Sequence, residues 1–116
     1  MKALSIQQPW AQLIVAGLKP IENRTWTTDY RGPLLIHAAQ RMSVEIEAVE
    51  RAFAIKIDRK ALHFGAIIGR VELVDIVTHS RSPWFAGPYG FVLRNPRPMH
   101  PLPWRGRLNL FEVDLP

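Results

Sequence analysis

The sequence predicts a small α+β protein in which about six strands form a β-barrel and two α-helices lie in the first half of the chain. A length of 116 residues allows one domain with one hydrophobic core, and no repeat or linker divides residues 1–116. Apolar residues fall into short strand-like runs and into two stretches with helical spacing. Gly65 and Gly69, inside the longest strand-like run, supply the bends that a barrel requires.

The first predicted elements are a strand over residues 1–6 and a helix that begins near Pro9. Proline is preorganised for the first helical position, and its missing N–H costs nothing there. Apolar side chains then recur on one helical face, and Gly17 ends the helix because glycine tolerates a positive φ. Residues 22–26 are expected to be extended, and a turn then leads into a short, continuously apolar and buried strand at 34–39.

A second, amphipathic helix is predicted after Ser43, which is a good N-cap residue. Acidic residues follow in the first turn, where the helix dipole favours them. Apolar residues recur at spacings of three and four, which indicates a helix that runs to about residue 57.

The second half of the chain predicts strands separated by turn-rich segments. Residues 64–77 form one long strand-like run, and residues 80–88 form a loop rich in serine, proline and glycine. A strand is expected at 89–94, and the prolines between 96 and 103 predict a stiff connector. Residues 108–115 alternate in character and predict the last strand.

The composition excludes several classes of protein. Hydrophobic residues make up 47% and charged residues 22% of the chain, which indicates a soluble globular protein rather than a disordered one. No stretch approaches the roughly 18 consecutive apolar residues of a membrane helix, so we expect no membrane partner. The absence of cysteine excludes disulfides, thiolate metal sites and cysteine nucleophiles. A chain without cysteine also fits a reducing cytosol, and we expect a cytoplasmic protein.

The charge distribution favours a polyanionic partner. Fifteen Lys and Arg residues against ten Asp and Glu residues give a net charge of +5. No acidic residue lies between Asp75 and Glu112, and this segment contains Arg81, Arg94, Arg97, Arg105 and Arg107. Arginine suits forked contacts to phosphate and stacking on bases, so the carboxyl-terminal third is expected to carry a positive face.

Two segments resemble a known family. Residues 4–26 contain the pattern G-x-K-x-x-E-x-R, formed by Gly17, Lys19, Glu22 and Arg24, preceded by Gln8-Pro9-Trp10-Ala11. This stretch resembles the opening of ASCH domains. Residues 82–96 are similar to the late strand of bacterial and phage members of that family, so the resemblance extends over nearly the whole chain.

The resemblance implies a PUA-like barrel with a cleft between the first helix and the barrel mouth, lined by the residues of that pattern. ASCH proteins are regarded as binders of RNA or other nucleic acids, with links to translation and transcription coactivation. Some small relatives resemble amidohydrolases that remove an acyl group from a modified cytidine with a lysine, a threonine three residues later and a glutamate. Here the position three after Lys19 is Glu22, so that activity does not carry over directly.

Glu22, Arg24 and Trp26 are spaced by two in a predicted strand and should face one way. Together they would form a nucleobase pocket in which the indole stacks on a base, the guanidinium contacts a phosphate and the carboxylate accepts hydrogen bonds from a base amino group. The structural alternative is an ion pair between Glu22 and Arg24 beside a core tryptophan.

The loop at 80–88, together with Tyr89 directly after it, is a second candidate surface. Its aromatic side chains, Trp84, Phe85 and Tyr89, would make stacking platforms for bases near arginines, or they would cover the open end of the barrel. Trp10 is expected to pack the helix against the barrel. The full set of expected nucleic-acid-binding residues is Lys19, Glu22, Arg24, Trp26, Arg31, Trp84 and Tyr89.

Lys19 and Glu22 are also the candidates for catalysis. Lys19 would act as a base or electrophile if burial lowers its pKa, with Glu22 relaying a proton. The four histidines show no ligand spacing, and His37 in its apolar strand is expected to be a hydrogen-bonded core residue, so no metal is predicted. No phosphate-cradling glycine motif occurs, and no cofactor is expected.

Three functional hypotheses remain open at the level of sequence. The first is a module that binds RNA, single-stranded nucleic acid or a nucleoside-like ligand in a basic, aromatic-lined cleft. The second is a small hydrolase, either an amidohydrolase on a modified nucleoside or a ribonuclease, that uses Lys19 and Glu22. The third is a protein-interaction module of the transcription coactivator type, which an exposed apolar patch would favour. The absence of a heptad seam predicts a monomer.

Overall fold

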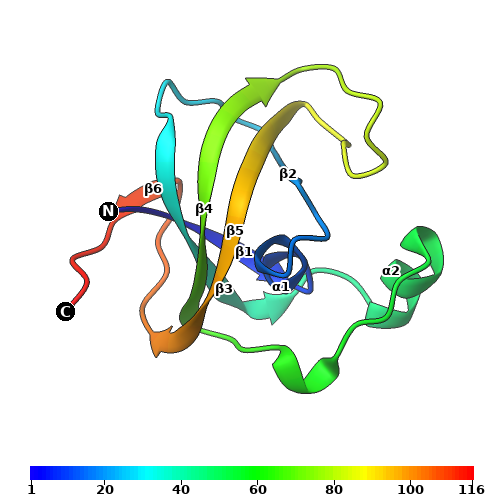
Figure 1. Cartoon of the computed structure of the whole chain (residues 1–116), viewed down its shortest axis with the longest axis horizontal. Helices are drawn as coiled ribbons and strands as arrows, with labels where there is room; N and C mark the ends of the chain where they lie inside the picture. Colours follow the sequence, from blue (N-terminus) through cyan, green and yellow to red (C-terminus); the bar gives the residue numbers. More distant parts are fainter.

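The computed structural model describes residues 1–116 as a mixed six-stranded sheet with two α-helices (Figure 1). This α+β architecture confirms the predicted fold class. No helix has both the length and the apolar character needed to cross a membrane. In chain order the elements are β1 (Lys2–Gln8), α1 (Trp10–Val15), β2 (Ile21–Arg24), β3 (Gly32–Met42), α2 (Ile46–Phe53), a 3₁₀ turn (Arg59–Ala61), β4 (Ala66–Val77), β5 (Tyr89–Pro103) and β6 (Leu110–Glu112).

The strands lie in the order β2-β5-β4-β3-β1-β6, and all neighbours are antiparallel except β1 and β3. Register shifts along β4 and β5 bend the sheet, as bulges do, and one of them includes Gly69. The sheet nevertheless remains open, because its edge strands β2 and β6 do not pair with each other. The closed barrel predicted from the sequence is therefore a curled, open sheet.

Helix α1 packs inside the curl of the sheet and completes the main core. Its residues Ala11, Ile14 and Val15 join buried side chains of β1, β3, β4 and β5. The helix comes close to β4 because Gly69 has no side chain: a Cβ there would lie 2.4 Å from Cγ1 of Val15. Because this helix supplies apolar surface to the core, the strands can bury their inner faces without closing a barrel.

Helix α2 is shorter than the sequence predicts. It begins at Ile46 rather than beside Ser43, and it ends at Phe53, where Ala54 takes a left-handed conformation with φ of 53°. The chain then turns back, so that Ile57 packs with Val49 and Leu13 in a small separate cluster. Of the apolar residues at helical spacing, Val49 and Ile57 are buried and Ile46 and Phe53 are half-buried, but tertiary packing rather than helix continuation brings Ile57 to this cluster.

Strand β5 is longer than predicted and includes the proline-rich segment expected to be a connector. β5 pairs with β4 along one edge, whereas on its other edge β2 pairs only with Tyr89 to Val92. The rest of this second edge of β5 is therefore free. Proline is tolerated on a free strand edge because no N–H is needed there. The last strand is shorter than predicted, only Leu110–Glu112.

Candidate functional site

A cleft of about 890 Å³ lies between β1 and β2. Two loops, residues 83–86 before β5 and residues 104–109 after it, also line the cleft, as do His37, Ala39 and Gln40 of β3 and Phe53 of α2. β6 pairs only with the first residues of β1, from Lys2 to Leu4, and β2 pairs only with β5. The cleft therefore occupies the gap that closure of the sheet would have filled.

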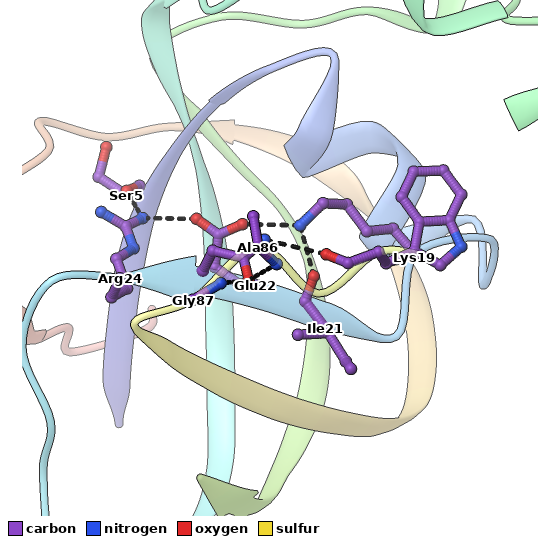
Figure 2. Close-up of polar contacts among 9 residues, drawn as sticks. Ser5, Lys19, Ile21, Glu22, Arg24, Ala86 and Gly87 are labelled. Atoms are coloured by element: carbon purple, nitrogen blue, oxygen red, sulfur yellow. Dashed lines mark hydrogen bonds and ion pairs between the residues drawn. The ribbon is translucent and has the colours of Figure 1, made fainter. Parts of the chain in front are cut away.

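A buried chain of charges crosses the floor of this cleft (Figure 2). Nζ of Lys19 lies 2.9 Å from Oε1 of Glu22, and Nη2 of Arg24 lies 3.1 Å from Oε2 of the same carboxylate. Lys19 is 4% and Glu22 is 7% exposed. One carboxylate thus lies between two cations, and its side of β2 is set by strand alternation, which points Glu22 and Arg24 the same way. The ion pair that the sequence offered as an alternative is present.

The ammonium group of Lys19 is enclosed by protein atoms. It also donates a hydrogen bond to the carbonyl of Ile21, and it lies 5.5 Å from the ring centroid of Trp10. Burial lowers the pKa of Lys19, while the neighbouring carboxylate of Glu22 opposes that shift. Lys19 is therefore held by fixed partners, and its proton is easier to remove than that of an exposed lysine.

Arg24 bridges the unpaired gap between β2 and β1. Its Nη2 donates a hydrogen bond of 2.7 Å to the carbonyl of Ser5, in addition to contacting Glu22. Its Nε is buried without a partner, and its Nη1 makes no hydrogen bond within the protein. A side chain thus connects two strands whose backbones do not pair, and it keeps a donor free at the cleft.

The cleft has an aromatic lining. All four tryptophans of the chain contribute to it, together with two phenylalanines: Trp10, Trp26, Phe53, Trp84, Phe85 and Trp104. Some of these rings are already stacked on protein neighbours. Trp84 lies parallel to Phe53 with ring centroids 3.8 Å apart, and Trp26 packs edge-on against Phe91 at 5.3 Å. The rings are therefore held in place before any ligand arrives.

Asn23 of β2 holds the loop that carries Trp84 and Phe85. Its Nδ2 donates to the carbonyl of Trp84 at 3.0 Å, and its Oδ1 accepts hydrogen bonds from the N–H groups of Ala86 at 2.8 Å and Gly87 at 3.0 Å. Asn23 lies between two residues of the charged chain but points to the opposite side of β2. The same short strand thus positions both the charges and the aromatic loop.

The charge of the cleft is positive. Lys19, Arg24, Arg105 and Arg107 line it, against the single carboxylate of Glu22. Arg105 and Arg107 are exposed and belong to the loop after β5. No group of three or more His, Asp or Glu side chains forms a metal-binding cluster in the structure.

The structure brings together five of the seven residues expected to bind nucleic acid: Lys19, Glu22, Arg24, Trp26 and Trp84. Arg31 and Tyr89 lie outside the lining of the cleft. Nη1 of Arg31 donates to the carbonyls of Thr28 and Tyr30, which stabilises the turn before β3. The side chain of Tyr89 packs against the main core.

Sequence reasoning missed part of the cleft. It assigned Trp10 to packing, and it placed Arg105 and Arg107 on a general positive face without connecting them to the pattern residues. Trp104 was not singled out at all. The signal in the sequence is the run Trp104-Arg105-Gly106-Arg107, which places an aromatic ring next to two arginines around a glycine.

Residues 4–87 match the family profile described as the ASCH domain. The chain belongs to the ASCH family. It is 30% identical to human activating signal cointegrator 1 and 29% identical to the mouse protein, in each case over 96% of this chain. The chain spans only 22% of the length of these two relatives.

Solved ASCH structures share the fold. The ASCH protein of Zymomonas mobilis superposes with a TM-score of 0.60, and a mutant of it with 0.63, each at 17% identity and over 97% of this chain. The matches cover 87% and 89% of those chains. At this level of identity the likeness supports the architecture of the ASCH domain and not a shared chemistry.

Proposed function

We propose that this ASCH domain binds RNA, single-stranded nucleic acid or a nucleotide-derived ligand in the cleft between β1 and β2. The observation that carries the proposal is the gathering of all four tryptophans around one positively charged cleft. Aromatic faces stack bases of any sequence, while arginines contact phosphates. The volume of about 890 Å³ also falls within the range of small-ligand sites, roughly 300–1,000 Å³.

The residues divide into two groups with different roles. Arg105 and Arg107 are exposed and would contact phosphates, with Nη1 of Arg24 as a further donor. Lys19 and Glu22 are nearly inaccessible, so their role is to fix Arg24 and the cleft floor rather than to touch a long polymer. This division makes Arg105 and Arg107 the better residues to mutate, because replacing Lys19 or Arg24 also breaks the buried charge chain.

Fluorescence anisotropy of a short labelled single-stranded RNA, titrated with protein at two salt concentrations, tests the proposal. We expect the affinity for RNA to fall as the salt concentration rises. Each lost phosphate contact should reduce the slope of the logarithm of affinity against the logarithm of salt concentration by about 0.7. The variant Arg105→Ala/Arg107→Ala should bind much more weakly. Arg51→Ala/Lys56→Ala removes the same charge from exposed positions outside the cleft and serves as the control. If both double variants bind RNA with equal affinity, the cleft is not the RNA-binding site.

A hydrolase that uses Lys19 and Glu22 is the second candidate. The supporting observation is the burial that lowers the pKa of Lys19, since an amine with a lowered pKa is a better base or nucleophile. Its close contact with Glu22, at 2.9 Å, would provide a path for the proton. Incubation of folded protein with a panel of acylated nucleosides and RNAs tests this candidate, and absence of turnover across the panel would eliminate it.

A further inference from the structure

Beyond Arg24, the cleft contains a second set of polar side chains that the charge chain does not use. Oγ of Ser5 lies 2.9 Å from Nδ1 of His37, and Nε2 of the same ring lies 2.7 Å from the carbonyl oxygen of Trp104. Ser5 and His37 both line the cleft. We propose that Ser5 and His37 form a nucleophile–base pair that cleaves small carboxylic esters.

The contacts determine which ring nitrogen of a neutral His37 carries the proton. A backbone carbonyl can only accept, so Nε2–H donates to the oxygen of Trp104. Nδ1 is then unprotonated and accepts the hydroxyl proton of Ser5. A serine that donates to an imidazole, which is itself oriented by a third group, is the arrangement by which hydrolases activate a serine nucleophile. In this chain the third group is a backbone carbonyl instead of a carboxylate.

Ser5 and His37 lie on two paired strands of the sheet. Ser5 of β1 and His37 of β3 are register partners in the parallel strand pair, so the sheet places them directly beside each other. His37 is only 2% exposed, and the backbone N–H of Trp104 is bonded to the carbonyl of Gly65 at 3.0 Å. The orienting carbonyl is therefore fixed as firmly as the imidazole. Such support is needed to keep a nucleophile and its base in productive geometry.

The surroundings of Ser5 also supply a positive charge. The backbone carbonyl of Ser5 accepts a hydrogen bond of 2.7 Å from Nη2 of Arg24, so the guanidinium lies beside the backbone of this residue. The backbone of Gly106 also passes close to the pair, because a Cβ there would lie 2.7 Å from Cε1 of His37 and 3.0 Å from Oγ of Ser5. Glycine at this position allows the loop backbone to cover the pair and limit its exposure to water.

The proposed reaction balances as an ordinary acyl transfer. Oγ of Ser5 attacks the ester carbonyl while its proton passes to Nδ1 of His37, and the free Nη1 of Arg24 stabilises the oxyanion. The carbon–oxygen bond to the alcohol then breaks, and His37 returns the proton to the leaving oxygen. Water, deprotonated by Nδ1 of His37, then attacks the acyl-serine. His37 returns this proton to the leaving Oγ of Ser5, and the released carboxylic acid ionises in solution. Tryptophans of the cleft favour an ester whose alcohol is aromatic.

Covalent labelling with a fluorophosphonate probe tests the pair directly, because the serine oxygen forms a bond to phosphorus and fluoride leaves. We expect a single adduct on the wild-type protein, located on Ser5 by peptide mass spectrometry. Ser5→Ala should remove it, whereas Ser43→Ala should leave it, since Ser43 lines the same cleft but has no hydrogen bond to a histidine. Mapping the wild-type adduct gives a result even if a variant fails to fold.

Hydrolysis of 4-nitrophenyl acetate provides the second readout. The rate catalysed by the wild type should fall about 100-fold or more in Ser5→Ala and in His37→Gln, consistent with loss of nucleophile or general base. The proposal is overturned if folded wild-type protein gives no adduct on Ser5, or if labelling persists unchanged in folded His37→Gln. Either result would mean that the hydrogen bonds among Ser5, His37 and the carbonyl of Trp104 serve only to hold residues 104–109 against the sheet. RNA binding by the exposed arginines is independent of both outcomes.

Discussion

Glu22 is the only carboxylate in the cleft, and it lies between the ammonium group of Lys19 and the guanidinium of Arg24. The substitution Glu22→Gln keeps the shape of this side chain and removes its charge. Lys19, which is 4% exposed, would then be a buried cation without a counter-charge. Removing one partner of a buried pair costs about 3–5 kcal/mol. That is a large part of the roughly 5–15 kcal/mol by which a typical domain is stable.

Urea denaturation followed by circular dichroism measures this loss. With a slope of about 2 kcal/mol per molar urea, the unfolding midpoint of Glu22→Gln should fall by about 2 M. Glu72→Gln is the matched control. Its carboxylate lies 3.5 Å from Nη2 of Arg70, with side chains 30% and 41% exposed, so its loss should cost only about 0–1 kcal/mol. Equal midpoints for the two variants would refute the buried-pair argument.

The pH dependence provides a sharper test. Burial lowers the pKa of Lys19 and the charge of Glu22 opposes this, so the pKa of Lys19 falls further in Glu22→Gln. A lysine whose pKa is lower in the folded state destabilises the fold while it is protonated. That loss is relieved as the pH rises from the folded pKa toward the unfolded value of about 10.4. The difference in unfolding free energy between wild type and Glu22→Gln should therefore shrink from pH 7 toward pH 10. A constant or growing difference would contradict the assignment of the loss to Lys19.

Two further predictions concern the elements around the cleft. Gly69→Ala should destabilise the fold by about 1–3 kcal/mol, because the new Cβ would lie 2.4 Å from Cγ1 of Val15 and 2.9 Å from the carbonyl of Arg97. Urea denaturation of the double variant Gly69→Ala/Val15→Ala should show less than the sum of the two single losses, and simple additivity would disprove the clash with Val15. Asn23→Ala removes three hydrogen bonds to the Trp84 loop, each worth about 1 kcal/mol, and should speed cleavage by trypsin after Arg81. Unchanged proteolysis would show that the loop is held by other contacts.

Local patterns predicted most of the elements, because strands and helices follow from the spacing of apolar residues. The helix at Pro9, the buried strand around His37 and the long strand with Gly69 all occur in the structure. The predictions differ where an end depends on distant packing. α2 stops at Phe53, since the chain must turn for Ile57 to reach Leu13, and β5 continues through its prolines because β2 leaves that edge free.

The sequence by itself determined the family, the α+β class and the side of β2 on which Glu22 and Arg24 lie, because neighbouring residues obey a fixed strand period. Only the tertiary structure decided that the sheet stays open, and that the gap becomes a cleft to which residues 104–109 contribute. The same holds for Ser5, His37 and Trp104, which lie 32 and 67 residues apart along the chain. Their meeting depends on the register of β1 against β3 and on the course of β5, and no local sequence pattern encodes either.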